Sequence, residues 1–315
     1  MTFQFADFAR QAASDRAISA DEILALRQAG WNDGKIGADE AEALIAVNAA
    51  LERRPAEWCD YFVEAICEYV INGAAPRGYV SEDNARWLIG HLDRDGELDS
   101  LVELELLVRL LGRAVGTPEV LKTYAIEQIE RAVLTGSGPT RDGGELSASH
   151  ITACEARLLR RVLFAPGSDG PASISQREAE LLFRLKDAAL RGPNAPEWKQ
   201  VFVQGVGNYL QGLTSPGSHV SRERAAELEA FMDSPGAGIG GFLGRMAKES
   251  PNVFGVVFGR KAPERDPLVE LAEAEQVTGE ERAWLDAHID ADGTVDEYER
   301  ALLDFLDEDA SRTRI

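Results

Sequence analysis

The chain has 315 residues and a formal net charge of −21, from 54 acidic and 33 basic side chains. This balance argues against nucleic-acid binding, because neutralising phosphates requires clustered Lys and Arg. A hydrophobic fraction of 44% indicates a folded protein, and the longest apolar runs are too short to cross a bilayer. We therefore expect no nucleic-acid partner and no membrane insertion.

The first residues, 1–7, lack a basic region followed by an apolar core, so we expect no signal peptide. Three cysteines without a CxxC pair fit a reducing compartment better than a disulfide framework. The predicted location is therefore cytoplasmic. The acidic surplus suits a basic partner or a cation, and the need to keep a helical protein in solution explains it as well.

Along the chain one pattern recurs: a turn, often Asp-Gly or Gly-Gly, then one residue, an aliphatic residue and a helical pattern. The turns begin at Asp33, Asp95, Gly143 and Asp292, with looser copies from Ile18, Val80, Ile174, Val220 and Val277. Hydroxyl residues stand where a helix N-cap belongs, at Ser19, Ser81, Ser147, Ser175, Ser221 and Thr278. Glu22 and Glu178 follow their serines at capping-box spacing. Because almost no segment alternates with period two, the sequence predicts an all-α protein of helix–loop–helix units.

Two pairs of segments indicate an internal duplication. Residues 91–99 match residues 288–296, and the surroundings of Trp58 match those of Trp198. We expect a first lobe over residues 1–134, whose last helix, from Pro118 to Leu134, connects the two halves. The second lobe covers residues 135–315. The aromatic residues of the Trp58 segment and their copies are expected in the core: Trp58, Phe62, Tyr69, Trp198, Phe202 and Tyr209.

The second lobe carries an insertion at about residues 232–270 that has no counterpart in the first. It is rich in glycine and is the least helix-like part of the chain. Residues 236–241 formally fit GxGxxG, but no strand precedes them, so we do not interpret them as a phosphate loop. Long loops of repeat proteins often carry binding sites, and the predicted partner-binding residues are Phe242, Leu243, Met246, Phe254 and Phe258. Alternatively, residues 254–258 complete the core of the second lobe.

The two matched Asp-Gly loops resemble the ion loop of EF-hands. With Gly96 and Gly293 as the turn glycine, the candidate ligands are Asp93, Asp95 and Asp99 in the first copy and Asp290, Asp292, Asp296 and Glu299 in the second. The resemblance implies Ca²⁺ as the cofactor. Both copies depart from the pattern at the first ligand position, where a histidine stands. An Asp-Gly turn followed by a capped helix explains the same residues without an ion.

The signature Asp-Gly-x-aliphatic-x-x-x-Glu also resembles the tellurite-resistance TerB family and the related co-chaperone DjlA. Residues 34–36 with Glu40, and residues 293–295 with Glu299, carry this resemblance. It implies an all-helical domain linked to metal binding and stress response.

The histidines and cysteines are expected to have structural roles and not catalytic or metal-binding ones. The four histidines form no HxxxH or HExxH pattern, and His91 and His288, at equivalent positions, are expected to cap the preceding helix. Cys59 and Cys67 are expected to be small buried apolar side chains.

No catalytic constellation is visible, so the chain is not expected to be an enzyme. The predicted function is a cytoplasmic protein-interaction module with an unidentified protein partner, regulated by a divalent cation or linked to stress response. One alternative is a purely structural adaptor with decayed ion loops. Another is a hydrolase that uses clustered carboxylates and a metal.

Overall fold

A computed structural model describes residues 3–31, 34–93, 96–141, 150–165, 174–210, 279–289 and 294–312. The regular secondary structure of these residues consists of α-helices, so the predicted all-α class is confirmed. The helices are α1 (Phe3–Asp15), α2 (Ala20–Gly30), α3 (Ala38–Ala50), α4 (Ala56–Asn72), α5 (Glu82–Leu92), α6 (Leu101–Arg113), α7 (Glu119–Thr135), α8 (Ala153–Leu163), α9 (Gln176–Ala189), α10 (Pro196–Leu210), α15 (Gly279–Ile289) and α16 (Glu297–Arg312). Within the described ranges, none of them is long and apolar enough to span a bilayer.

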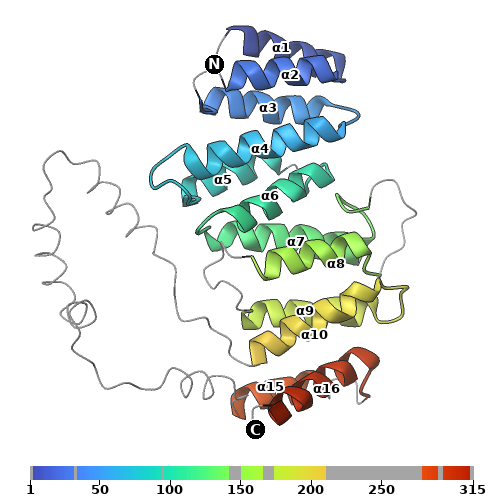
Figure 1. Ribbon diagram of the computed structural model, residues 1–315. Coiled ribbons are helices and arrows are strands. Elements are labelled where there is room, and N and C mark those ends of the chain that lie inside the picture. The colour runs from blue at the N-terminus through green and yellow to red at the C-terminus, as the bar shows by residue number, and fades with distance from the viewer. Residues whose placement is uncertain are drawn as a thin grey trace, which may run out of the picture.

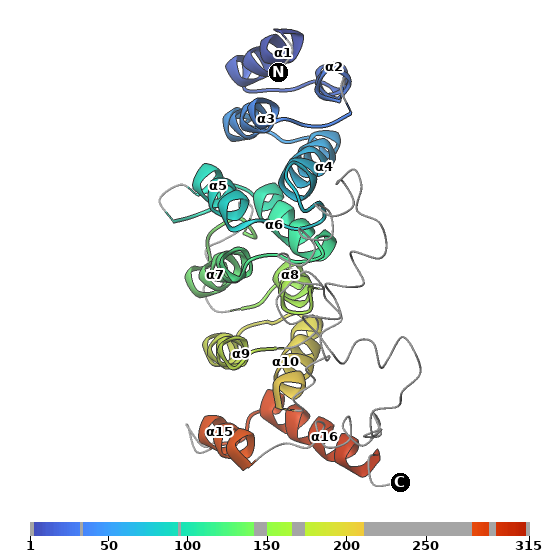
Figure 2. The same ribbon diagram turned by 90° about the vertical axis from the view of Figure 1, so that its left-hand side faces the viewer.

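The helices form an elongated stack of two layers (Figures 1 and 2). In Figure 2, α1, α3, α5, α7, α9 and α15 make one column, and α2, α4, α6, α8, α10 and α16 make the other. Within the second column α4 packs on α6, α6 on α8, α8 on α10 and α10 on α16. Stacked helical hairpins of this kind are the architecture of α-solenoids.

Local capping chemistry explains where many helices begin. The side chains of Ser19, Ser81 and Ser175 accept hydrogen bonds from the backbone N–H three residues later, which confirms these three predicted N-caps. The other predicted caps, Ser147, Ser221 and Thr278, lie outside the described residues. Helix α8 begins under a cap that was not predicted, Thr152.

The aromatic residues expected in the core are found there, with one difference. Trp58, Phe62, Trp198 and Phe202 are fully buried. Tyr69 and Tyr209 are only partly buried, and each ring packs edge-on against a tryptophan of α5 or α15, with centroids 5.0 and 4.9 Å apart. The paired aromatic residues therefore join the two layers of the stack.

The predicted connecting helix is α7, which packs against α5 and α6 on one side and against α8 and α9 on the other. The stack consequently continues across residue 135 without a break. The division into lobes at 134/135 and the internal duplication stay predictions. The insertion at 232–270, with its five proposed partner-binding side chains, lies outside the described residues.

Candidate functional site: an arginine-lined groove

The predicted metal ligands Asp296 and Glu299 are held by a lysine. The Nζ of Lys186 on α9 lies 2.7 Å from Asp296 Oδ2 and 2.6 Å from Glu299 Oε1. The second oxygen of Glu299 accepts the Asp296 N–H at 2.9 Å, and Asp296 Oδ1 accepts the Glu299 N–H at 3.0 Å. These two carboxylates therefore cap α16 and pair with an ammonium group, whereas Asp290 and Asp292 lie outside the described residues.

Lys186 is buried, with 2% of its side chain exposed. Burial by itself lowers the pKa of Lys186, but hydrogen bonds to Asp187, Asp296 and Glu299 outweigh burial and raise the pKa above its usual value. The lysine is therefore a permanent cation beside two predicted ligands of the second Asp-Gly loop.

The first Asp-Gly loop is closed by backbone contacts and by side chains of α7. Asp93 Oδ1 accepts the Gly96 N–H at 2.6 Å, and the Gly96 carbonyl accepts hydrogen bonds from Arg131 at 2.6 Å and Gln128 at 3.0 Å. Gly96 has a φ of +89°, a left-handed conformation that explains the glycine. The Asp99 N–H donates to Glu103 at 2.9 Å, and Asp95 lies outside the described residues. No cluster of three or more His, Cys, Asp or Glu side chains able to hold a metal occurs in the described ranges.

A glutamate in the first turn of several helices has the same structural role. It stands at the third helical position and accepts a backbone N–H of the N-cap region, while a side chain from elsewhere in the stack binds its carboxylate. The pairs are Asn48–Glu103, Arg141–Glu155, Lys122–Glu178 and Lys186–Glu299. These buried carboxylates fasten neighbouring helices together.

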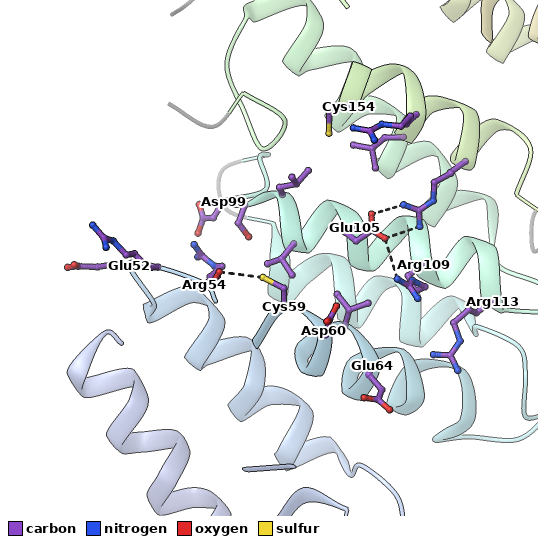
Figure 3. A pocket seen from close by; sticks show the side chains of 18 residues that line it. Glu52, Arg54, Cys59, Asp60, Glu64, Asp99, Glu105, Arg109, Arg113 and Cys154 are labelled. Carbon is purple, nitrogen blue, oxygen red and sulfur yellow. Dashed lines mark hydrogen bonds and ion pairs between the residues drawn. The ribbon is translucent and has the colours of Figure 1, made fainter. Parts of the chain in front are cut away.

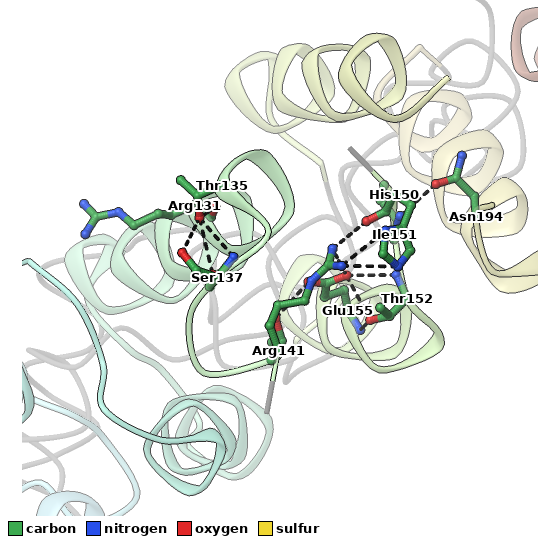
Figure 4. Close-up of polar contacts among 10 residues, drawn as sticks. Arg131, Thr135, Ser137, Arg141, His150, Ile151, Thr152, Glu155 and Asn194 are labelled. Carbon is green, nitrogen blue, oxygen red and sulfur yellow. Dashed lines mark hydrogen bonds and ion pairs between the residues drawn. The ribbon is translucent and has the colours of Figure 1, made fainter. Parts of the chain in front are cut away.

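Arg141 shows how tight such a contact is (Figure 4). Its guanidinium donates to both oxygens of Glu155, at 2.8 and 3.0 Å, and to the His150 carbonyl. The side chains of the pair are 7% and 0% exposed. The Thr140 hydroxyl donates to the same carboxylate at 2.8 Å. The segment that follows α7 is therefore anchored to the start of α8.

Asn48 organises the corresponding contact in the first half of the chain. Its amide donates to Glu103 at 2.8 Å, and its oxygen accepts the Trp58 indole N–H at 3.1 Å and the Arg54 Nε–H at 3.2 Å. Burial, and next the charge of Asp99, raises the pKa of Glu103. The network links α3, α4 and α6 and holds Arg54 in place.

The histidines and two of the thiols can now be placed. His91 and His288 each donate from Nδ1 to the carbonyl of the tryptophan four residues earlier, at 2.8 Å, which agrees with the expected structural role. Burial raises the pKa of Cys67 to about 12, as expected for a buried thiol. Cys59 is only half-buried and lines a cavity, so its prediction as a buried side chain is wrong.

This cavity, which we call the arginine groove, has a volume of about 1080 Å³ and lies along α4, α6 and α8 (Figure 3). Six arginines line it: Arg53, Arg54, Arg109, Arg113, Arg157 and Arg161. Five carboxylates also line it: Glu52, Asp60, Glu64, Asp99 and Glu105. Burial raises the pKa of the thiols of Cys59 and Cys154, which therefore remain protonated at neutral pH.

The groove is more positive than its lining suggests, because two of its carboxylates are paired from outside. Glu52 binds Arg16 at 3.3 Å, and Glu64 binds Arg27 of α2. With these two carboxylates set aside, six guanidinium groups and three carboxylates remain in the lining. Among the described residues, no carboxylate lies within ion-pair distance of Arg53 or Arg113. A region of local positive charge thus lies on a strongly acidic protein.

Glu105 occupies the middle of the groove. Both of its oxygens bind the Arg161 guanidinium, at 2.7 and 2.9 Å, and Arg109 lies 3.8 Å away. The Arg161–Glu105 pair joins α8 to α6, and its side chains are 43% and 30% exposed. The pair is therefore accessible from the groove.

Sequence reasoning missed the arginine groove. The available signal was the spacing of Arg109 with Arg113 and of Arg157 with Arg161, because like charges four residues apart lie on one helix face and destabilise it slightly. Nothing local indicates that these two faces meet.

Comparison of the chain with protein-family models, curated proteins and solved structures found no match. The resemblances to TerB and to EF-hands therefore stay predictions from short motifs.

Proposed function

We propose that this chain is a non-catalytic interaction module that binds a negatively charged partner in the arginine groove. The gathering of six guanidinium groups in one cavity of a chain with a net charge of −21 carries the proposal. Guanidinium groups bind carboxylates and phosphates through two parallel hydrogen bonds. On an acidic protein, such a cluster attracts anions that the rest of the surface repels.

The architecture supports this proposal. Stacked helical hairpins present extended surfaces for partners, and the arginine groove takes its lining from three helices of one layer, α4, α6 and α8, and from the segments that precede α4 and α6. Its volume reaches the upper end of the range for ligand pockets, roughly 300–1,000 Å³. A segment of a partner chain therefore fits the groove better than a small ion does.

Of the two forms of interaction module predicted from the sequence, we propose the adaptor in which the second Asp-Gly loop no longer regulates binding through a cation. The ammonium of Lys186 supports this form, because it already binds one carboxylate oxygen of Asp296 and one of Glu299. The predicted link to stress response depends on the TerB resemblance alone.

The test is binding of fluorescent poly-L-glutamate, measured by anisotropy at low and moderate salt. The groove variant is Arg53→Glu with Arg113→Glu, because both side chains are exposed and make no ion pair in the described ranges. The matched control is Arg10→Glu with Arg177→Glu, which changes the net charge equally at exposed arginines on α1 and α9.

We expect the wild type and the control to bind, and the groove variant to lose at least about tenfold in affinity, which is 1.4 kcal/mol. Far-UV circular dichroism confirms that all three proteins are folded. No binding by the wild type, or equal loss in both variants, would overturn the proposed function.

A further inference from the structure

The arginine groove has a direction, because it follows one face of α6 from end to end. Leu101, Glu105, Arg109 and Arg113 all line it and are spaced by four residues. Residues at this spacing lie above one another on a helix. At 1.5 Å per residue, the stripe is roughly 18 Å long.

Each end of the groove holds two arginines, which lie beside carboxylates of the lining. Arg53 and Arg54 precede α4, and Figure 3 shows Arg54 beside Asp99 at the end where α6 begins. Arg109 and Arg113 lie at the opposite end, with Cys59 and Glu105 between the two groups. Arg53 and Arg113, for which no ion pair is found among the described residues, therefore lie at opposite ends of the groove.

The floor between these ends is apolar. Val63 of α4, Val102 of α6 and Leu158 of α8 line the groove and are buried among the helices. An apolar side chain of a ligand that reaches this floor leaves water, which favours binding in proportion to the area covered.

From this arrangement we propose, on the basis of the proposed function, that the partner segment is an extended peptide with acidic residues at both ends of a short apolar centre. An extended chain spans about 3.3 Å per residue, so roughly six residues cover the stripe on α6. Carboxylates at the two ends pair with Arg53 and Arg54 and with Arg109 and Arg113, while the central side chains face the floor.

The lining argues for a peptide rather than a nucleic acid. Among the described residues, no aromatic side chain lines the groove, whereas single-stranded nucleic acids are usually held by aromatic side chains on which bases stack. A peptide with charges only at its ends avoids the carboxylate in the centre.

Glu105 sets the specificity of the end formed by Arg109 and Arg113. It already binds Arg161 through both oxygens and lies 3.8 Å from Arg109. An incoming carboxylate at this end must share these guanidinium groups with Glu105. Glu105→Gln removes the competing charge and keeps the size of the side chain, so it strengthens binding of the acidic peptide.

The experiment uses the full chain and fluorescein-labelled six-residue peptides. The first peptide has two glutamates, a leucine, a valine and two glutamates. The second replaces leucine and valine by serine and glycine, the third is hexaglutamate, and the fourth replaces all glutamates by lysine. Poly-L-glutamate and an oligothymidylate serve as unlabelled competitors.

We expect the first peptide to bind at least about tenfold more tightly than the second and third, and the lysine peptide not to bind. Glu105→Gln should increase affinity several-fold, and the Arg53→Glu, Arg113→Glu variant should reduce it. Equal affinity for the first three peptides, with poly-L-glutamate still bound, would overturn this proposal alone. Stronger competition by oligothymidylate would overturn it in favour of a nucleic acid. Failure of both poly-L-glutamate and the first peptide to bind would overturn the proposed function as well.

Discussion

Lys186 provides the sharpest test of how the stack is held together. Lys186→Met keeps a long apolar stem but removes the ammonium that lies 2.6 Å from Glu299 and 2.7 Å from Asp296. The side chain of Glu299 is 2% exposed and that of Asp296 is 10% exposed, so water can replace little of the lost interaction. Removing one partner of a buried ion pair costs about 3–5 kcal/mol, and we expect about 4 kcal/mol here.

Urea unfolding, followed by far-UV circular dichroism, measures this cost. The matched control is Lys199→Met, because Lys199 of α10 also pairs with a glutamate of α16, Glu297, but at 3.2 Å and with side chains 42% and 66% exposed. An exposed pair contributes less than about 1 kcal/mol. A loss below about 1 kcal/mol for Lys186→Met, or equal losses in both variants, would refute the reasoning.

A second substitution separates the buried charge from the helix cap. Glutamine at position 299 can still accept the Asp296 N–H, because Gln also serves at the third position of a capping box. Adding Glu299→Gln to Lys186→Met removes the more deeply buried of the two carboxylates that lose the ammonium, and it should restore more than half of the lost stability. A further loss in the double variant would show that capping, and not the ion pair, is the main role of Glu299.

The pH dependence of this pair has a definite sign. The pKa of Lys186 is raised in the folded protein, so the folded state holds the proton more tightly than the unfolded chain does. The contribution of Lys186 to the free energy of unfolding is fully present below the pKa of lysine in the unfolded chain, about 10.4. This contribution is lost as the pH rises through the pKa of Lys186 in the folded protein. The stability difference between the wild type and Lys186→Met should therefore shrink above about pH 10.4.

Three further predictions concern other parts of the stack. Asn48→Leu should cost about 3 kcal/mol in urea unfolding, since it leaves the Trp58 indole N–H without its partner and removes the donor to one oxygen of the buried Glu103; a cost below about 1 kcal/mol would contradict the network. Gly207→Ala should cost about 1–3 kcal/mol, because a Cβ there would lie 2.6 Å from the Phe305 ring. Its control, Gly112→Ala, meets nothing within 4 Å and should not destabilise the protein. Excess Ca²⁺ should leave the melting temperature unchanged. If Ca²⁺ bound a site and were present at one hundred times the Kd of that site, it would add about 2.7 kcal/mol to the free energy of unfolding. A rise in melting temperature with Ca²⁺ would restore the ion-loop hypothesis.

The class of the fold and many helix starts could be predicted because they depend on residues close together in the chain. Ser19 and Ser175 cap helices through contacts with residues only three positions later. The buried tryptophans Trp58 and Trp198 follow from the apolar pattern of their own helices. Such features are local, so spacing in the sequence reports them directly.

The Asp-Gly loops were ambiguous for a physical reason. A capping box and an ion loop both require carboxylates at the turn and at the start of the following helix, so the same spacing fits both. At Asp296 and Glu299 the ammonium of Lys186 favours the capping box over the ion loop. Lys186 lies 110 and 113 residues away from them in the chain. No local pattern records such a partner.

The sequence alone determined that the chain is helical, acidic and built from capped helix–loop–helix units. The arginine groove was decided by the tertiary structure. The paired arginines of α6 and α8 are visible as stripes at helical spacing, but the sequence does not say that these stripes face one cavity. They meet because every second helix stacks in the same layer, which places α4, α6 and α8 side by side across the helices that separate them in the chain. Burial of apolar faces fixes this stacking, and the charged side chains at its edge are brought together as a consequence.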